Sequence, residues 1–233
     1  MRPLLYLLLC PLLLPAQNPL ATLIETHQAD LGVWASNPDK YEIQVLYTEI
    51  DRKEDGTVAL QTHRWGAADT TQYFYPASTV KMPAAILALQ RLNELGVVGL
   101  DHRTPLFHGA GTAPAAAPQT AVSTDATAPS GLPTVENYLR KIFLVSDNDA
   151  YCRLFEWLGP TYLNQALQRV GITGGRLQHR VGVGGFDTET HAWLNPVRFA
   201  DGYQTLYQIG ERHDPWYDPL PHVNGQFRGE GFT

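Results

Sequence analysis

The chain has few cysteines and no clustered positive charge. Its 233 residues include only two cysteines, Cys10 and Cys152, and 17 Lys and Arg against 23 Asp and Glu, which gives a formal net charge of −6. Proteins that bind nucleic acid usually carry a basic patch or stripe, and no such run of Lys and Arg occurs in the sequence. We therefore expect no nucleic-acid partner.

The sequence also lacks the residue spacing that is typical of a metal site. None of the eight histidines belongs to a His-Glu-x-x-His or similar arrangement, so we expect no metal and no cofactor. The composition is that of a globular protein, because 44% of the residues are hydrophobic and 10% are aromatic. A chain of this length and composition can bury a sizeable core.

The first residues predict a secretory signal and not a membrane span. Arg2 is followed by an apolar stretch over 4–14 and by a small residue at Ala16. The stretch is too short and too interrupted by proline to cross a bilayer as a helix. We expect residues 1–17 to be removed and the mature protein, residues 18–233, to be secreted or periplasmic without a stable membrane span.

A lipid anchor at Cys10 is the alternative interpretation of the same segment. Leu9 stands where a small residue is expected before a lipidated cysteine, which argues against a lipoprotein. Loss of Cys10 on cleavage leaves Cys152 without a partner for an internal disulfide. Because Cys152 lies in an apolar-periodic stretch, we interpret it as a small buried hydrophobe.

Hydrophobic periodicity and turn signals predict helices and a hairpin. An amphipathic helix is expected over 19–31, and a β-hairpin within 41–65 whose turn ends in the Asp55-Gly56 pair. The further helices are expected over 78–95, over 134–158 with a break at 146–149, and over 161–171. The first of these is expected to bury Val80, Ile86, Leu89 and Leu92 and to end at Gly96.

Two glycine-containing segments lack helix or strand signals. The segment 109–133 is rich in Ala, Pro, Thr and Gly, and we expect a loop that is either a linker or a long excursion within one domain. The flanking helices favour the excursion. Gly182, Gly184 and Gly185 do not match a dinucleotide-binding fingerprint, because its third glycine would fall at Asp187, and we interpret them as turn residues.

Ser78 and Lys81 stand three residues apart at the predicted start of a helix. This spacing puts them on one helix face, where a lysine with a lowered pKa can take the proton of a serine hydroxyl. The N–H of Ser78 and one strand N–H would then form an oxyanion hole. The pattern alone is weak, since serine is also a favoured helix cap.

A second motif, Ser146-Asp147-Asn148, lies about 65 residues downstream at the predicted helix break. Ser146 is suited to relay a proton to a leaving group, and Asn148 to hold the lysine or the substrate. The triplet alone is also a common N-cap with an Asx turn. The two motifs in this order, however, belong to the motif set of class A β-lactamases and penicillin-binding proteins.

The chain thus resembles the class A β-lactamase-like serine hydrolases over about residues 19–210. The resemblance implies an α/β (α+β) fold of the β-lactamase/transpeptidase type, with a mostly antiparallel sheet flanked by helices and an all-helical region. It implies that Ser78 is the acylated nucleophile, Lys81 its base or proton relay, and Ser146 and Asn148 a second proton-transfer and positioning pair. We expect a β-lactam or D-Ala-D-Ala-like substrate and a monomeric protein.

The deacylation base departs from the family pattern. The family places a Glu four residues before an Asn, and here His191 stands four residues before Asn195, with Glu189 two residues earlier. Glu189 and His191 are therefore the candidate bases, with solvated loop residues as the alternative. Asn195 is the candidate substrate-positioning residue.

A second departure is that no Lys-Thr/Ser-Gly triplet follows Asn148. In the family that triplet lies on the strand beside the nucleophile, where it binds the substrate carboxylate and supplies an oxyanion N–H. We therefore expect a C-terminally truncated chain with its final strands missing. The alternatives to a β-lactamase are a D-Ala-D-Ala carboxypeptidase or esterase of the same fold, and a penicillin-sensing or degenerate relative that does not hydrolyse.

Overall fold

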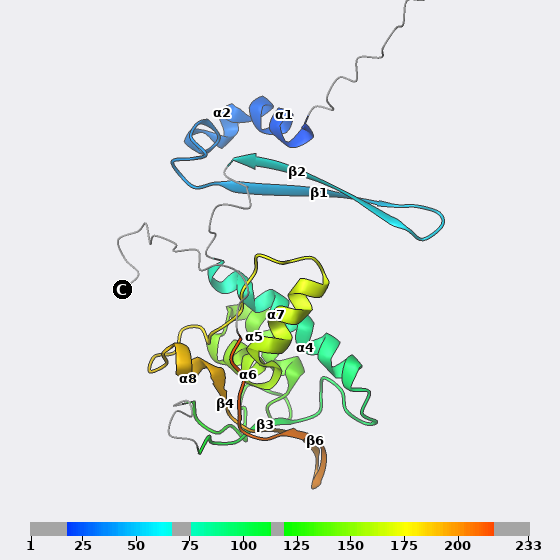
Figure 1. Ribbon diagram of the computed structural model, residues 1–233, viewed down its shortest axis with the longest axis vertical. Coiled ribbons are helices and arrows are strands. Elements are labelled where there is room, and N and C mark those ends of the chain that lie inside the picture. The colour runs from blue at the N-terminus through cyan, green and yellow to red at the C-terminus, as the bar shows by residue number, and fades with distance from the viewer. Residues whose placement is uncertain (1–17, 67–75, 113–118, 217–233) are drawn as a thin grey trace, which may run out of the picture. The chain divides into compact units, whose positions relative to one another are not determined.

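The computed structural model describes residues 18–66, 76–112 and 119–216 (Figure 1). The fold is mixed α/β, and every strand pairing among these residues is antiparallel. The chain divides into two compact units between Phe74 and Tyr75. The predicted signal segment lies outside the described residues.

The N-terminal unit contains three short helices and a β-hairpin. The elements are α1 (Pro19–Thr26), α2 (Gln28–Leu31), α3 (Val33–Ser36), β1 (Gln44–Arg52) and β2 (Val58–Gly66). The single helix predicted over 19–31 is therefore wrong in its continuity. It is interrupted at His27, and α2 ends at Leu31, directly before Gly32, whose φ of 60° favours glycine.

The hairpin prediction is confirmed. β1 and β2 pair in one register from Gln44 opposite Gly66 to Arg52 opposite Val58. In the turn, Asp55 Oδ1 accepts a hydrogen bond of 2.8 Å from the backbone N–H of Thr57, and Gly56 has a φ of 83°. An Asx-type turn followed by a glycine with positive φ is the geometry that the Asp-Gly pair favours.

The C-terminal unit is built around one helix, α6 (Asn148–Leu158). Every side chain from Ala150 to Leu158 is buried, which is typical of a helix packed on all sides. Its helical neighbours are α4 (Lys81–Leu95), α5 (Val135–Val145) and α7 (Pro160–Arg169). Two short helices, η1 (Ala77–Val80) and α8 (Thr188–Ala192), complete the helical part of this unit.

Short antiparallel strands join this helical core. The three-stranded sheet has the order β3 (Leu106–His108), β5 (Val197–Asp201), β6 (Gln204–Ile209), and β4 (Trp193–Leu194) pairs with β7 (Arg212–His213). Phe199 of β5 is fully buried against Trp157 of α6, with ring centroids 4.9 Å apart. The described part of the predicted loop 109–133 forms no helix or strand.

The end of α4 agrees with the sequence prediction, but its buried face does not. Gly96 ends α4 with a φ of 58°, and Leu92 is buried as expected. Ile86 and Leu89, however, are 55% and 41% exposed, so their predicted burial is wrong. The packed face consists mainly of small residues, which let neighbouring helices approach closely: Ala84, Ala85, Leu87 and Ala88.

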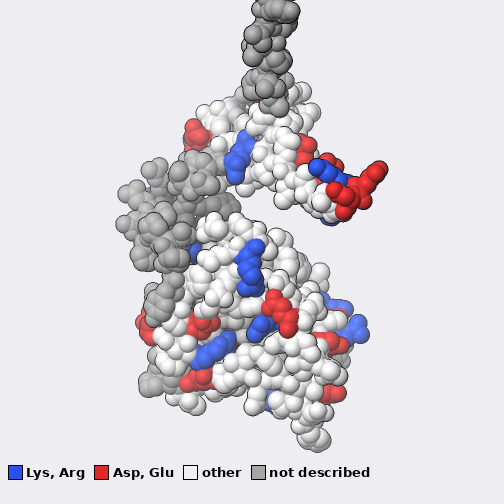
Figure 2. All heavy atoms as spheres, turned by 45° about the vertical axis from the view of Figure 1, so that its right-hand side comes forward, with Lys and Arg blue, Asp and Glu red and all other residues white. Residues whose placement is uncertain are grey.

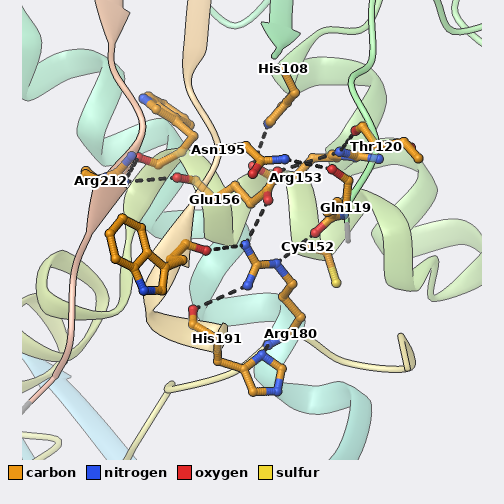
Figure 3. A network of polar contacts seen from close by, with 12 residues as sticks. His108, Gln119, Thr120, Cys152, Arg153, Glu156, Arg180, His191, Asn195 and Arg212 are labelled. Atoms are coloured by element: carbon orange, nitrogen blue, oxygen red, sulfur yellow. Dashed lines mark hydrogen bonds and ion pairs between the residues drawn. The ribbon is translucent and has the colours of Figure 1, made fainter. Parts of the chain in front are cut away.

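A network of buried polar groups joins α6 to segments that precede and follow it in the chain (Figure 3). Arg180 Nη2 donates to Glu156 Oε1 at 2.8 Å, and neither side chain has any exposed surface. Arg180 Nε donates to Gln119 Oε1 at 2.8 Å, and the second buried guanidinium, that of Arg153, lies 3.6 Å from Glu156 Oε2. Glu156 is therefore the buried counter-charge beside both guanidinium groups, and Arg153 has a second partner, the exposed Asp149, at 3.2 Å.

The surface carries charge of both signs. On the face drawn in Figure 2, the described Lys and Arg side chains are interspersed with Asp and Glu. None of the helices in the described part of the chain is long and apolar enough to cross a membrane.

The Glu156→Gln substitution is expected to lower the free energy of unfolding by about 3–5 kcal/mol, because it leaves the buried guanidinium of Arg180 without its counter-charge and removes one of the two carboxylates beside Arg153. Urea denaturation measures this loss. The matched control is Glu136→Gln, which removes ion pairs with the exposed Arg140 (2.8 Å) and the exposed Arg103 (3.2 Å) and should cost about 1 kcal/mol or less. Equal losses in the two variants would contradict this role of Glu156.

Candidate active site

Ser78 and Lys81 lie where η1 passes into α4. Ser78 is exposed, whereas Lys81 is only 2% exposed. The amine of Lys81 donates to Ser78 Oγ at 3.2 Å. A solvent-facing hydroxyl is thus in contact with a buried amine, which is the arrangement that an activated serine nucleophile requires.

The break between α5 and α6 brings the second motif to the same amine. Lys81 Nζ donates to Ser146 Oγ at 2.9 Å, to Asn148 Oδ1 at 2.6 Å, and to the backbone carbonyl of Ser146. The four residues that the sequence singles out, Ser78, Lys81, Ser146 and Asn148, therefore meet around one nitrogen atom.

Unusual backbone conformations flank this cluster. Ser146 has φ 55° and ψ 41°, in the left-handed region that costs a non-glycine residue about 1–3 kcal/mol. This conformation ends α5, and Asp147 then caps α6 by accepting a hydrogen bond of 2.8 Å from Ala150 N. Ala77, directly before Ser78, also has a positive φ of 46°. The surrounding packing must hold both residues in place.

The amine of Lys81 is surrounded by oxygens that carry no full charge. Burial lowers the pKa of Lys81, and the more distant carboxylate of Asp147 opposes this shift only in part. A lowered pKa increases the fraction of neutral amine near neutral pH, and the neutral amine is the form that accepts a proton. The electrostatics of the cluster thus favour Lys81 as a base for Ser78.

The two candidate deacylation bases contact other groups. Glu189 Oε1 lies 3.1 Å from His213 Nε2, and its side chain is 66% exposed. His191 stacks on the ring of Phe186, and its Nδ1 accepts a hydrogen bond of 3.2 Å from Arg180 N. Burial lowers the pKa of His191 to about 4, so its imidazole is neutral but only weakly basic.

Asn195 lies in the buried network of Figure 3. Its side chain has no exposed surface, and Nδ2 donates to the backbone carbonyl of Gln119 at 2.8 Å. This hydrogen bond joins the turn between β4 and β5 to the segment at Gln119.

Gly182 is a neighbour of the cluster that sequence reasoning missed. A Cβ atom built on Gly182 would overlap Asn148 Nδ2 and lie 2.7 Å from Asn148 Cγ. The glycine-rich turn was visible in the sequence, but nothing in it indicated which side chain the turn approaches. Cys152, by contrast, is fully buried, as its apolar surroundings in the sequence predict.

The cluster is suited to acyl transfer, since it combines an accessible hydroxyl, a buried amine and a second hydroxyl on the same amine. Within the three described ranges, no group of three or more His, Cys, Asp or Glu side chains could hold a metal ion.

Comparison with known proteins identifies one family. A profile of the beta-lactamase enzyme family matches residues 20–216, which include Ser78, Lys81 and the Ser146-Asp147-Asn148 motif. Neither the curated proteins nor the solved structures yield a match. Because the family profile spans most of the chain, the protein belongs to the beta-lactamase enzyme family.

Proposed function

We propose that the protein is a serine hydrolase of the class A β-lactamase type, which opens β-lactam amides through an acyl-enzyme on Ser78. The observation that carries the proposal is the position of Lys81 Nζ, 3.2 Å from Ser78 Oγ and 2.9 Å from Ser146 Oγ. One amine is within proton-transfer distance of two hydroxyls. Membership of the beta-lactamase enzyme family supports the reaction class.

In the proposed acylation, neutral Lys81 takes the proton of the Ser78 hydroxyl while Oγ attacks the lactam carbonyl carbon. The tetrahedral oxyanion collapses and breaks the lactam C–N bond. Lys81 gives a proton to Ser146, whose own proton passes to the departing nitrogen. The products are an ester on Ser78 and a neutral Lys81, so protons and electron pairs balance.

Asn148 has a separate role in this scheme. Its Oδ1 accepts from Lys81 Nζ at 2.6 Å. Lys81 is an ammonium between the two proton transfers, and a hydrogen bond to a charged donor is stronger than one to a neutral donor. Asn148 therefore stabilises the intermediate state of the lysine and fixes the direction of its amine.

Hydrolysis of the ester requires a base that activates water. Glu189 pairs with His213, and His191 accepts from Arg180 and stacks on Phe186. None of these contacts involves a residue of the Lys81 cluster, and the pKa of His191 is lowered to about 4. We propose that deacylation is slow and that the acyl-enzyme accumulates.

This observation favours a second candidate function. A D-Ala-D-Ala carboxypeptidase or esterase of the same fold uses the same Ser78 and Lys81 on a peptide or ester, and a penicillin-sensing or degenerate relative does not hydrolyse at all. The rate of β-lactam turnover separates these candidates from a β-lactamase.

In either case we propose a monomer that residues 1–17 direct to the periplasm or the exterior.

A fluorescent penicillin is expected to label the protein covalently, and Ser78→Ala is expected to abolish the label, because it removes the attacking oxygen. In-gel fluorescence and the mass of the peptide that contains residue 78 measure the reaction. Ser130→Ala, at another exposed serine, should label like the wild type. A label that persists in Ser78→Ala would contradict the assignment of Ser78 as the nucleophile.

A chromogenic cephalosporin is expected to give a burst of about one equivalent of colour followed by a slow phase, because acylation precedes a slow hydrolysis. Stopped-flow absorbance resolves the two phases. Fast linear turnover without a burst would contradict slow deacylation and would favour an efficient β-lactamase.

Acylation is expected to slow as the pH falls through the pKa of Lys81, because the protonated amine cannot accept the Ser78 proton. Since burial lowers this pKa, the loss begins at a lower pH than for an ordinary lysine. Lys81→Arg should be labelled about 10²–10⁴-fold more slowly at every pH, since a guanidinium stays protonated. Lys141→Arg is the matched control, and a Lys81→Arg variant of full activity would refute the role of the base.

A further inference from the structure

The contact between Gly182 and Asn148 links a loop to the amine of Lys81. A side chain at position 182 would overlap Asn148 Nδ2 and press on Cγ, which lies 2.7 Å from the Cβ position. On the other side of the same amide, Asn148 Oδ1 accepts from Lys81 Nζ at 2.6 Å. The amide of Asn148 is therefore held between the backbone of Gly182 and the amine of Lys81.

The loop that carries Gly182 is fixed along α6, the helix that begins at Asn148. The contacts that fix it are Tyr151 Oη to His179 O (3.2 Å), Cys152 Sγ to Val181 O (3.6 Å) and Arg180 Nη2 to Glu156 Oε1 (2.8 Å). They come from three positions along one buried helix. The loop cannot move away from Asn148 without breaking buried interactions, which is costly.

We infer that Gly182 is a positioning residue, whose missing side chain keeps Asn148 in hydrogen-bond contact with Lys81. Gly182 has a φ of 68°, a conformation that L-residues rarely adopt, and it leaves no room for a Cβ. Because the loop is anchored, a larger residue at position 182 displaces the end of the Asn148 side chain. The inference rests on the proposed acylation only for its kinetic readout.

The consequence for the reaction follows from the role of Asn148. When its Oδ1 leaves Lys81, the ammonium formed between the two proton transfers loses its hydrogen-bond acceptor at 2.6 Å. The acylation rate then falls although Ser78, Lys81 and Ser146 are unchanged. Position 182 thus acts on the chemistry through Asn148.

The chain offers matched controls for the test. Gly184 is in the same loop, and a Cβ there would meet nothing within 4 Å. Gly171 has a φ of 85°, and its Cβ position is likewise free, so Gly171→Ala reproduces the backbone strain without the contact. Thermal unfolding of each variant shows whether it is folded before its rate is compared.

The first measurement compares the labelling rates with a fluorescent penicillin. Gly182→Ala is expected to react at least about tenfold more slowly than the wild type, and Gly184→Ala and Gly171→Ala within about twofold of it. In an Asn148→Gly background, which removes the displaced side chain, Gly182→Ala should add less than about twofold. Additive losses, or equal rates for Gly182→Ala and Gly184→Ala, would overturn the inference.

The second measurement does not depend on activity. The side-chain amide resonance of Asn148, assigned from its loss in Asn148→Gly, is expected to shift in Gly182→Ala and to stay in place in Gly184→Ala. If the wild type takes no label, the proposed function fails, and this resonance still decides the inference. If Gly182→Ala alone does not fold, Asn148→Gly should restore folding to the double variant, and a double variant that stays unfolded would refute the role of the contact.

Discussion

The arrangement of the site depends on the hydrogen bonds that the buried amine of Lys81 donates. Its acceptors come from three places in the chain: Ser78 in η1, Ser146 after α5, and Asn148 at the first turn of α6. Removing a cation from water is costly unless other groups bind it, so each acceptor has to be held in place. The strained φ at Ser146 and the close approach of Gly182 are two features of the fold that hold them.

The placement of these acceptors depends in turn on α6. This helix is buried from Ala150 to Leu158, and its buried carboxylate, that of Glu156, pairs with guanidinium groups that come from α6 itself and from the loop at residue 180. The same loop passes Asn148. The same helix thus carries Asn148, an acceptor for Lys81, at its first turn and Glu156, which binds the opposing loop, two turns later. Stability and site geometry are linked through one element.

Local signals in the sequence predict much of the fold, and its two motifs taken together single out Lys81 and the three residues around it. Asp55-Gly56 marks the hairpin turn, Gly96 the end of α4, and Asp147 the start of α6, because each acts within a few residues of its own position. The buried face of α4 and the network around Asn195 were not predicted, since close packing on alanines and contacts such as Asn195 with Gln119 join segments that no local pattern relates. Gly182 was read as a turn for the same reason.

The most direct test of the account is the pKa of Lys81, measured from its Cε resonance as a function of pH and assigned with Lys81→Arg. Burial among uncharged oxygens predicts a titration midpoint below the ordinary lysine value of about 10.4. An Asn148→Ala variant, which removes an acceptor for the ammonium, should lower the midpoint further. A midpoint at or above the ordinary value would contradict the claim that this lysine is poised to deprotonate Ser78.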